Sequence, residues 1–392
     1  MKLASSLSRL GTETAFDVLA RAVALEQAGR SIINLGIGQP DFPTPSNIVE
    51  AAVRALREGH HGYTPANGIL PLREAVARDV ARRRGVEIDP DHIVIVPGGK
   101  VTMFFAILMF GEPGVEIMYP DPGFPIYRSV IEYTGAAAVP IALHEERGFA
   151  FSADEVLSRI TPRTRLIILN SPANPTGGVV PKAELDRLVA GLERFADVAL
   201  LSDEIYSRIV YDGTPHVSLL GYPAIRDRLI LLDGWSKTYA MTGWRIGYGI
   251  WPPALVAHAV RLAINCHSCV HAATQWAAIE ALEGPQDAVD RMVAEFDRRR
   301  RVILRLLNEL PGFRCVMPGG AFYAFANISG TGLKAVELQD GLLEEEGVAA
   351  IAGTSFGRFG EGYLRFSYAA SIEAIEEGMD RIRRYLERHA RG

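Results

Sequence analysis

Lys237 lies just beyond the end of a predicted buried strand, the apolar run 228–233, with Ser236 before it and Arg245 eight residues later. A lysine in a loop at a strand end can form a Schiff base with an aldehyde cofactor, and a serine and an arginine can bind the phosphate of that cofactor. A lone lysine is usually a solvated surface residue. The serine, the arginine and two nearby glycines favour a cofactor site instead.

Polar side chains also follow the two preceding predicted strands. Asn174 lies just after the apolar run 166–170, and Asp203 ends the run that starts at Val198, with Tyr206 three residues later. A carboxylate can keep a cofactor's ring nitrogen protonated, so that the ring accepts electrons from a substrate carbanion. An aspartate here can instead cap a helix, and the Asn-Pro-Thr-Gly sequence at Asn174 is by itself an ordinary turn. Because parallel strands end at one edge of a sheet, we expect these groups to lie together.

A second candidate anion site is the loop with Gly98, Gly99 and Lys100, which lies between a predicted strand and an apolar helix. Free backbone amides at a helix N-terminus bind anions, and glycines allow close approach. The loop is not a P-loop, because Val94 stands where that motif has glycine and Val101 where it has serine or threonine. The chain also lacks a G-x-G-x-x-G fingerprint, which argues against a dinucleotide enzyme.

The segment around Lys237 resembles the lysine signature of class I aminotransferases, in the pyridoxal-phosphate (PLP) fold-type I superfamily. The resemblance extends from about Arg9 to Leu386. It implies that Lys237 binds PLP and that Asp203 faces the pyridine nitrogen, and it gives the other cofactor contacts to a set of surrounding residues. These are Gly98, Gly99, Lys100, Phe124, Asn174, Tyr206, Ser236, Arg245 and Tyr63.

Two aromatic residues in this set have specific implied roles. Phe124 corresponds to the residue that stacks on the cofactor ring, where family members commonly have tyrosine or tryptophan. An aromatic in a Pro-Gly loop otherwise packs in a core or lid. Tyr63 resembles the tyrosine that reaches a phosphate in the neighbouring subunit, which implies a homodimer with shared sites. The alternative is a surface tyrosine in a turn.

Arg365 is the candidate for binding the carboxylate of an amino-acid substrate. It lies mid-strand among apolar residues, where an unpaired charge is costly, and a guanidinium binds a carboxylate bidentately. The alternative is a structural ion pair. The resemblance also implies substrate contacts from the Gly38 amide and from Asn174, and it places Gly319–Tyr323 beside the active site.

Substrate choice depends on a few further residues. Lys100 can bind an acidic side chain, or it can be a solvated residue at a helix start. Asn265, His267 and His271 are expected near the partner's site. Aspartate or glutamate is the leading expectation, followed by aromatic amino acids and alanine.

The expected reaction is ping-pong transfer of an amino group to a 2-oxo acid such as 2-oxoglutarate. A PLP-dependent C–S β-lyase is the nearest alternative, since fold does not determine reaction. A non-enzymatic PLP-sensing regulator would need a DNA-binding domain, for which the stretch before Gly36 leaves no room.

The elements expected to position these residues alternate between strands and helices. Predicted strands and helices follow one another from 92 to 233, which indicates an α/β fold with a mostly parallel sheet flanked by helices. A helical stretch from 251 to 283 is expected next. We expect an N-terminal segment at 1–45 that joins the small domain, a large PLP-binding domain at 46–285 and a smaller α+β domain at 286–392.

Composition restricts the class of protein. The chain has 392 residues, 48% hydrophobic and 22% charged, with a net charge of −5, as in ordinary globular proteins without nucleic-acid or membrane partners. The arginine run Arg298–Arg301 is expected to be a solvated helix face. Cys266 and Cys269 have C-x-x-C spacing but no second pair, so we expect no metal site and interpret them as buried or partly buried free thiols. No signal peptide is evident, and we expect a cytoplasmic protein.

Overall fold

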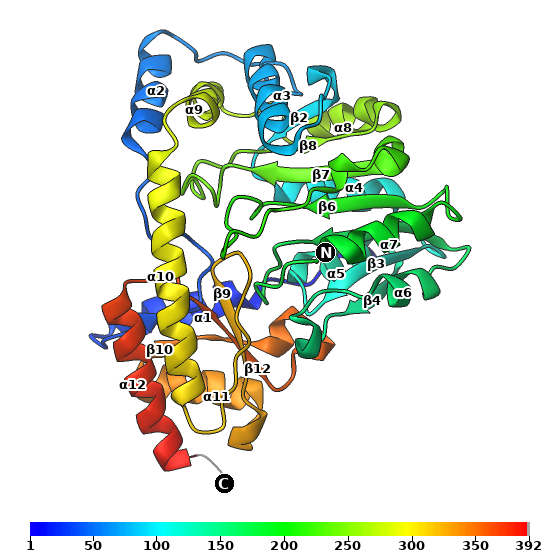
Figure 1. Cartoon of the computed structure of the whole chain (residues 1–392). Coiled ribbons are helices and arrows are strands. Elements are labelled where there is room, and N and C mark those ends of the chain that lie inside the picture. Colours follow the sequence, from blue (N-terminus) through cyan, green and yellow to red (C-terminus); the bar gives the residue numbers. More distant parts are fainter. Residues whose placement is uncertain (390–392) are drawn as a thin grey trace.

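The main feature of the computed structural model, which describes residues 1–389, is a seven-stranded sheet (Figure 1). Its strands are β2 (Ile93–Val96), β3 (Glu116–Asp121), β4 (Ala137–Ala142), β5 (Thr164–Asn170), β6 (Ala199–Asp203), β7 (Leu229–Gly234) and β8 (Gly247–Ile250). They lie in the order β2-β8-β7-β6-β5-β3-β4, and only β8 runs antiparallel to its neighbours. The expected α/β fold with a mostly parallel sheet is confirmed.

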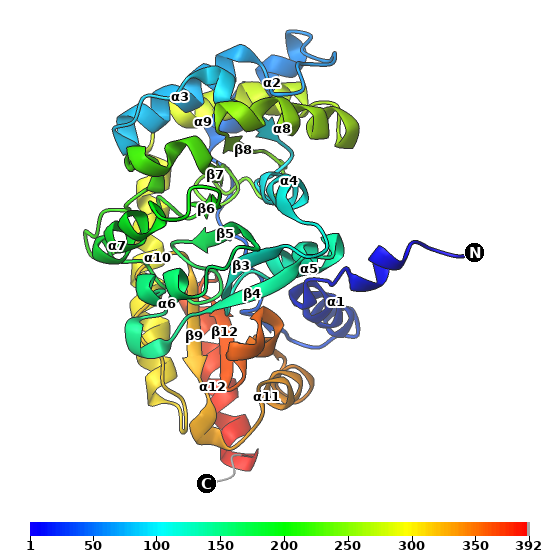
Figure 2. The same cartoon turned by 90° about the vertical axis from the view of Figure 1, so that its right-hand side faces the viewer.

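Helices cover both faces of this sheet. They are α2 (Ser46–Arg57), α3 (Leu70–Arg84), α4 (Lys100–Phe110), α5 (Pro125–Thr134), α6 (Ala153–Ser158), α7 (Lys182–Leu192), α8 (Pro253–Cys266) and α9 (Ala272–Glu283). Figure 2 shows α6 and α7 on one face and α4 and α5 on the other. Every residue of β6 and β7 is buried, as expected for apolar strands covered on both faces.

Two features of this region differ from the sequence-based expectation. Strand β8 was not predicted, because glycines are poor strand formers; here Gly247 lets β8 lie directly against the backbone of Gly99. The single helical stretch predicted from 251 to 283 is wrong, because α8 and α9 are separate. Between them Ser268 has a left-handed backbone (φ 62°). The side chain of His271 accepts a hydrogen bond from the Thr274 amide and so acts as the N-cap of α9.

The C-terminal third forms a second, three-stranded antiparallel sheet. Its strands are β9 (Tyr323–Asn327), β11 (Ile351–Ala352) and β12 (Tyr363–Ser367), and its helices are α10 (Asp287–Glu309), α11 (Ala335–Gly341) and α12 (Ile372–His389). The N-terminal segment contributes α1 (Thr14–Gln27) and β1 (Ile33–Asn34), which pairs in parallel with β10 (Val348–Ala349). The domain boundaries near 45 and 285 stay a prediction.

The arginine run on α10 is only partly solvated, which corrects the sequence-based interpretation. Arg299 and Arg300 are 6% and 0% exposed. Arg299 pairs with Asp41, and Arg300 pairs with Asp212. Acidic partners distant in the sequence therefore make burial of these charges tolerable.

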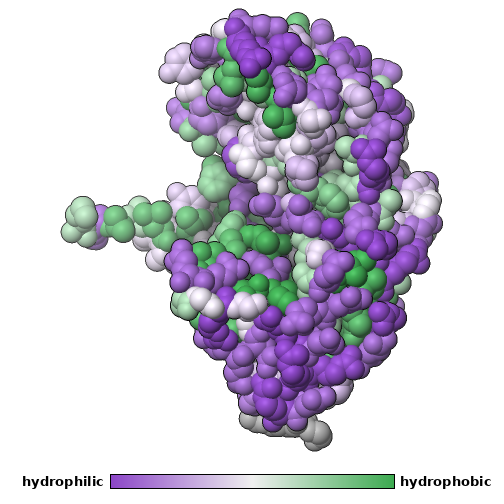
Figure 3. Space-filling model, turned by 90° about the vertical axis from the view of Figure 1, so that its left-hand side faces the viewer, coloured by the Kyte–Doolittle hydropathy of each residue, from purple (hydrophilic) through white to green (hydrophobic). Residues whose placement is uncertain are grey.

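The first residues of the chain project from the body as a largely hydrophobic arm (Figures 2 and 3), whereas Gly11 and Glu13, closer to α1, contact α5 and α4. Leu3, Leu7 and Leu10 are exposed on it. Cys266 is exposed, contrary to the expectation of a buried or partly buried thiol, and Cys269 is half-buried. Within residues 1–389, no helix is both long and apolar enough to cross a membrane, and no group of three or more His, Cys, Asp or Glu side chains could hold a metal ion.

Candidate active site

A cavity of about 660 Å³ lies at the carboxyl ends of the central strands. Strand register places Asn170 beside Asp203 and Asp203 beside Leu232, so β5, β6 and β7 are adjacent. The predicted meeting of their polar residues at one sheet edge is confirmed. All the predicted site residues line the cavity except Gly98 and Tyr63. Those that do are Gly38, Gly99, Lys100, Phe124, Asn174, Asp203, Tyr206, Ser236, Lys237, Arg245 and Arg365.

Lys237 presents its amine to the middle of this cavity. Its Nζ donates a 2.6 Å hydrogen bond to the carbonyl oxygen of Gly38. Burial lowers the pKa of Lys237 to about 8, and the positive charges of Arg365, Arg245 and Lys100 add to this effect. A substantial fraction of the amine is therefore neutral near physiological pH, as nucleophilic chemistry requires.

Asp203 is held by two hydrogen-bond donors. The Tyr127 hydroxyl donates to Oδ2 at 2.6 Å, and the Ile205 amide donates to Oδ1 at 3.2 Å. Burial raises the pKa of Asp203 to about 6. The carboxylate ends β6 and caps no helix. Sequence reasoning missed Tyr127, although it lies three residues after the predicted Phe124.

Arg365 is buried without a carboxylate partner. Its Nη1 donates to Oδ1 of Asn174 at 2.9 Å and its Nη2 to the carbonyl oxygen of Gly36, but its Nε has no partner. The guanidinium carbon lies 4.6 Å from the ring centroids of both Tyr323 and Phe356. Among the described residues no ion pair satisfies Arg365. The structural ion-pair alternative is therefore not supported, and the buried cation can accept an anionic ligand.

Tyr206 and Tyr323 form a pair on the same side of the cavity. Their hydroxyl oxygens are 2.8 Å apart, and burial raises the pKa of both phenols. Tyr323 belongs to the predicted Gly319–Tyr323 segment. Both hydroxyls therefore remain protonated donors at neutral pH.

Gly98, Gly99 and Arg245 surround the opposite end of the cavity. Gly98 has a left-handed backbone (φ 91°), and a side chain on it would collide with the guanidinium of Arg245. Arg245 itself has φ 52° and donates to the Thr242 carbonyl at 2.7 Å. The helix α4 starts two residues after Gly98, at Lys100, so its N-terminus lies close in the chain to the glycine that contacts this guanidinium. This end therefore suits an anion.

Lys100 and Phe124 lie at the entrance with a third residue that sequence reasoning missed. Lys100 Nζ lies 3.0 Å from Oε2 of Glu13 and 5.2 Å from the centroid of the Phe124 ring. Lys100 is therefore neither a freely solvated residue nor an unpaired one. No sequence signal identifies Glu13, which lies 87 positions away.

Residues 30–382 match the sequence model of the family described as aminotransferase class I and II. The chain belongs to this family.

Named relatives and solved structures match this aminotransferase along nearly its whole length. An aspartate aminotransferase of Pyrococcus horikoshii is 40% identical over 361 residues, 91% of each chain. Aromatic-amino-acid aminotransferase 2 of Thermococcus litoralis is 39% identical over 93% of this chain and 94% of its own. The crystal structure of an aspartate aminotransferase from Rhizobium meliloti superposes with a TM-score of 0.94, at 34% identity and 99% coverage of both chains. The fold is that of the aspartate aminotransferases.

Aminotransferases of this class use PLP, and the cavity has groups suited to each part of that molecule. An amine with a lowered pKa, at Lys237, suits the aldehyde. A buried carboxylate, at Asp203, suits the ring nitrogen. Free amides, a close-approach glycine and Arg245 suit the phosphate. The residues present therefore fit the cofactor.

Besides Gly98, four residues singled out from the sequence do not line this cavity. Tyr63 is 93% exposed. Asn265 donates to the Arg261 carbonyl, His271 caps α9, and His267 stacks on Phe105 at 6.1 Å. None of the four lines the cavity formed by this chain.

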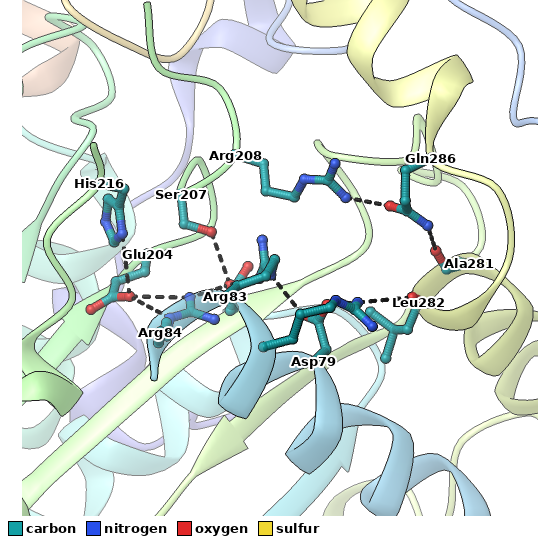
Figure 4. A network of polar contacts seen from close by, with 12 residues as sticks. Asp79, Arg83, Arg84, Glu204, Ser207, Arg208, His216, Ala281, Leu282 and Gln286 are labelled. Carbon is teal, nitrogen blue, oxygen red and sulfur yellow. Dashed lines mark hydrogen bonds and ion pairs between the residues drawn. The ribbon is translucent and has the colours of Figure 1, made fainter. Parts of the chain in front are cut away.

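A buried ionic network lies behind the strand ends (Figure 4). Arg84, at the end of α3, donates to Glu204 at 3.1 Å and to Asp233 at 2.6 Å, and all three side chains are at most 5% exposed. Glu204 follows Asp203, and Asp233 lies four residues before Lys237. Arg84 therefore links the end of β6, which carries Asp203, to β7, which leads into the loop with Lys237.

Proposed function

We propose that this aminotransferase binds PLP through Lys237 and transfers an amino group from an L-amino acid to a 2-oxo acid, such as 2-oxoglutarate, by a ping-pong mechanism. The observation that supports this most directly is the single cavity lined by Lys237, Asp203 and Arg365. When bound, PLP supplies an electron sink for the charge that develops at the substrate Cα.

Each residue then has a defined task. The neutral Lys237 amine removes the proton from the substrate Cα and later returns a proton, as base and then acid. The Asp203 carboxylate holds a positive charge at the ring nitrogen. Tyr206 and Asn174 donate hydrogen bonds toward the phenolic oxygen, while Ser236 and Arg245 bind the phosphate.

The substrate carboxylate binds at Arg365, with Asn174 and the Gly38 amide beside it. Because Arg365 Nε has no partner and the side chain is only 3% exposed, a bidentate anion would compensate a buried charge. Aspartate or glutamate remains the leading substrate prediction, with aromatic amino acids and alanine next. Relatives named as aspartate and aromatic-amino-acid aminotransferases support both groups.

The working unit is a homodimer in the cytoplasm. Tyr63, which is exposed and outside its own cavity, reaches the cofactor phosphate of the partner. The hydrophobic N-terminal arm also supports association, since exposed apolar surface of this kind usually contacts another chain (Figure 3).

Half-reactions with a panel of amino acids test the proposal. Without a 2-oxo acid, each good donor should convert the cofactor once, with loss of its aldehyde-form absorbance and stoichiometric release of the 2-oxo product. Continued product and ammonia release without an acceptor would instead identify a lyase. No reaction with any amino acid would contradict the proposed function.

A further inference from the structure

Glu13 stands at the entrance of the cavity in an unusual arrangement. It is the N-cap residue of α1, yet its side chain makes no capping hydrogen bond. Instead, Oε2 accepts a 3.0 Å hydrogen bond from Nζ of Lys100, the first residue of α4. The side chain of Glu13 is 20% exposed and that of Lys100 is 43% exposed. The hydrogen bond from Lys100 therefore replaces the capping hydrogen bond that the Glu13 side chain could accept within α1.

The charges around the cavity leave Lys100 as the cation available to a substrate side chain. Arg365 is assigned to the substrate carboxylate, and Arg245 lies against the Gly98 loop. Of the described residues that line the cavity, Glu13 and Asp203 are the acidic ones, and Asp203 already accepts a hydrogen bond from Tyr127. Glu13 is thus the carboxylate that faces an incoming side chain.

Apart from Glu13 itself, the part of the cavity lining that comes from the N-terminal segment is largely apolar. Ala15, Phe16 and Ile37 line the same cavity as Glu13. An uncharged side chain can pack against them without disturbing the ion pair. A second carboxylate must either displace Glu13 from Lys100 or lie next to it, and like charges repel.

We propose that Glu13 is a specificity-determining residue: by binding Lys100, it weakens the binding of substrates with acidic side chains relative to that of substrates with uncharged ones. Because ion pairs with this degree of exposure are weak, Glu13 biases the choice and does not exclude acidic substrates. The inference rests on the proposed function for the placement of the substrate.

Aspartate and alanine form a matched pair of substrates, since they differ by one carboxylate. In Glu13→Gln, the ratio of kcat/KM for aspartate to kcat/KM for alanine should rise about tenfold. Adding Lys100→Met should abolish that rise, because Lys100 is the group released. Asp17→Asn is the control, since it removes an exposed charge from the same helix, and its ratio should stay within about twofold of the original.

A binding measurement separates this inference from the proposed reaction. Calorimetry with the cofactor-loaded protein compares succinate with propionate, which again differ by one carboxylate. Glu13→Gln should tighten succinate binding about tenfold and leave propionate nearly unchanged. An unchanged succinate affinity, or equal gains for both ligands, would overturn the role of Glu13. If no amino acid reacts, the proposed function fails, but succinate binding still decides this inference.

Discussion

The Tyr127 hydroxyl donates a 2.6 Å hydrogen bond to Oδ2 of Asp203, and both side chains are buried. Burial alone favours the protonated carboxyl and raises the pKa of Asp203 to about 6, whereas the donors at Tyr127 and Ile205 act in the opposite direction. The charge on Asp203 at neutral pH therefore depends on hydrogen bonds from a residue 76 positions away.

Tyr127→Phe should make Asp203 harder to ionise. Without the hydroxyl, the pKa of Asp203 should rise above about 6, so the acid limb of the kcat/KM profile should move to higher pH. A hydrogen bond to a charged group is worth about 1.5 to 3 kcal/mol, so kcat should fall about tenfold or more at pH 7. An unshifted acid limb would show that Tyr127 only fills space.

Asp203→Asn should slow proton abstraction far more than it weakens cofactor binding. The amide preserves shape and can still accept from Tyr127, but it carries no charge to hold a protonated ring nitrogen. We expect kcat to fall about 100-fold or more, on the scale of other electrostatic contributions at active sites. Spectroscopic titration of the cofactor checks its affinity. Near-normal turnover would mean that Asp203 is structural.

Lys237 should carry the covalent link to the cofactor. The purified protein should be yellow, and borohydride should fix the cofactor to Lys237, as mapped by mass spectrometry of peptides. Lys237→Ala should still bind cofactor through the phosphate and ring contacts, but should lose nearly all turnover. A label found on Lys100 or Lys182 would contradict the assignment.

Cofactor uptake by the cofactor-free protein should depend on pH through Lys237. Burial lowers the pKa of Lys237 from 10.5 to about 8, and the neutral amine is the reactive form. The uptake rate, followed by absorbance, should rise as pH increases through about 8 and level off above it. Glu13 opposes the lowering, so Glu13→Gln should move the midpoint to lower pH. A rise that continues toward pH 10 would indicate an ordinary solvated lysine.

Subunit mixing should test whether Tyr63 crosses the dimer interface. If each site combines Arg365 of one chain with Tyr63 of the other, a heterodimer of Tyr63→Ala and Arg365→Ala chains has one site with both changes and one with neither. Activity should therefore rise above that of either homodimer after subunit exchange. Loss of the bidentate contact should cost about 3 kcal/mol, but loss of one phosphate hydrogen bond only about 1 to 2 kcal/mol. No recovery, with exchange confirmed by mass, would show that each site is built from one chain.

Much of the fold could be predicted because its signals are local. The apolar runs that became β5, β6 and β7 are continuous and flanked by helical segments, which is typical of strands buried on both faces. Since these strands are parallel neighbours, residues that follow each of them necessarily meet at one edge. Lys237, Asp203 and Asn174 could therefore be brought together from sequence order alone.

Other features depend on contacts that have no local pattern. Strand β8 contains two glycines, whose missing side chains permit close packing but also remove the strand signal. Arg299 and Arg300 share a helix run with exposed arginines, and acidic partners distant in the sequence, Asp41 and Asp212, help to make their burial tolerable.

The amino-acid sequence by itself determined the fold class, the position of Lys237, Asp203 and Asn174 at the ends of strands, and the residue types of the site, because hydrophobic periodicity and short motifs act over neighbouring positions. Only the tertiary structure decided which groups donate hydrogen bonds to Asp203 and which carboxylate pairs with Lys100. Those pairs, Tyr127 with Asp203 and Glu13 with Lys100, are separated by 76 and 87 positions. They form because tertiary packing places α5 beside the end of β6 and the start of α1 beside the start of α4, so that the side chains come within hydrogen-bonding distance.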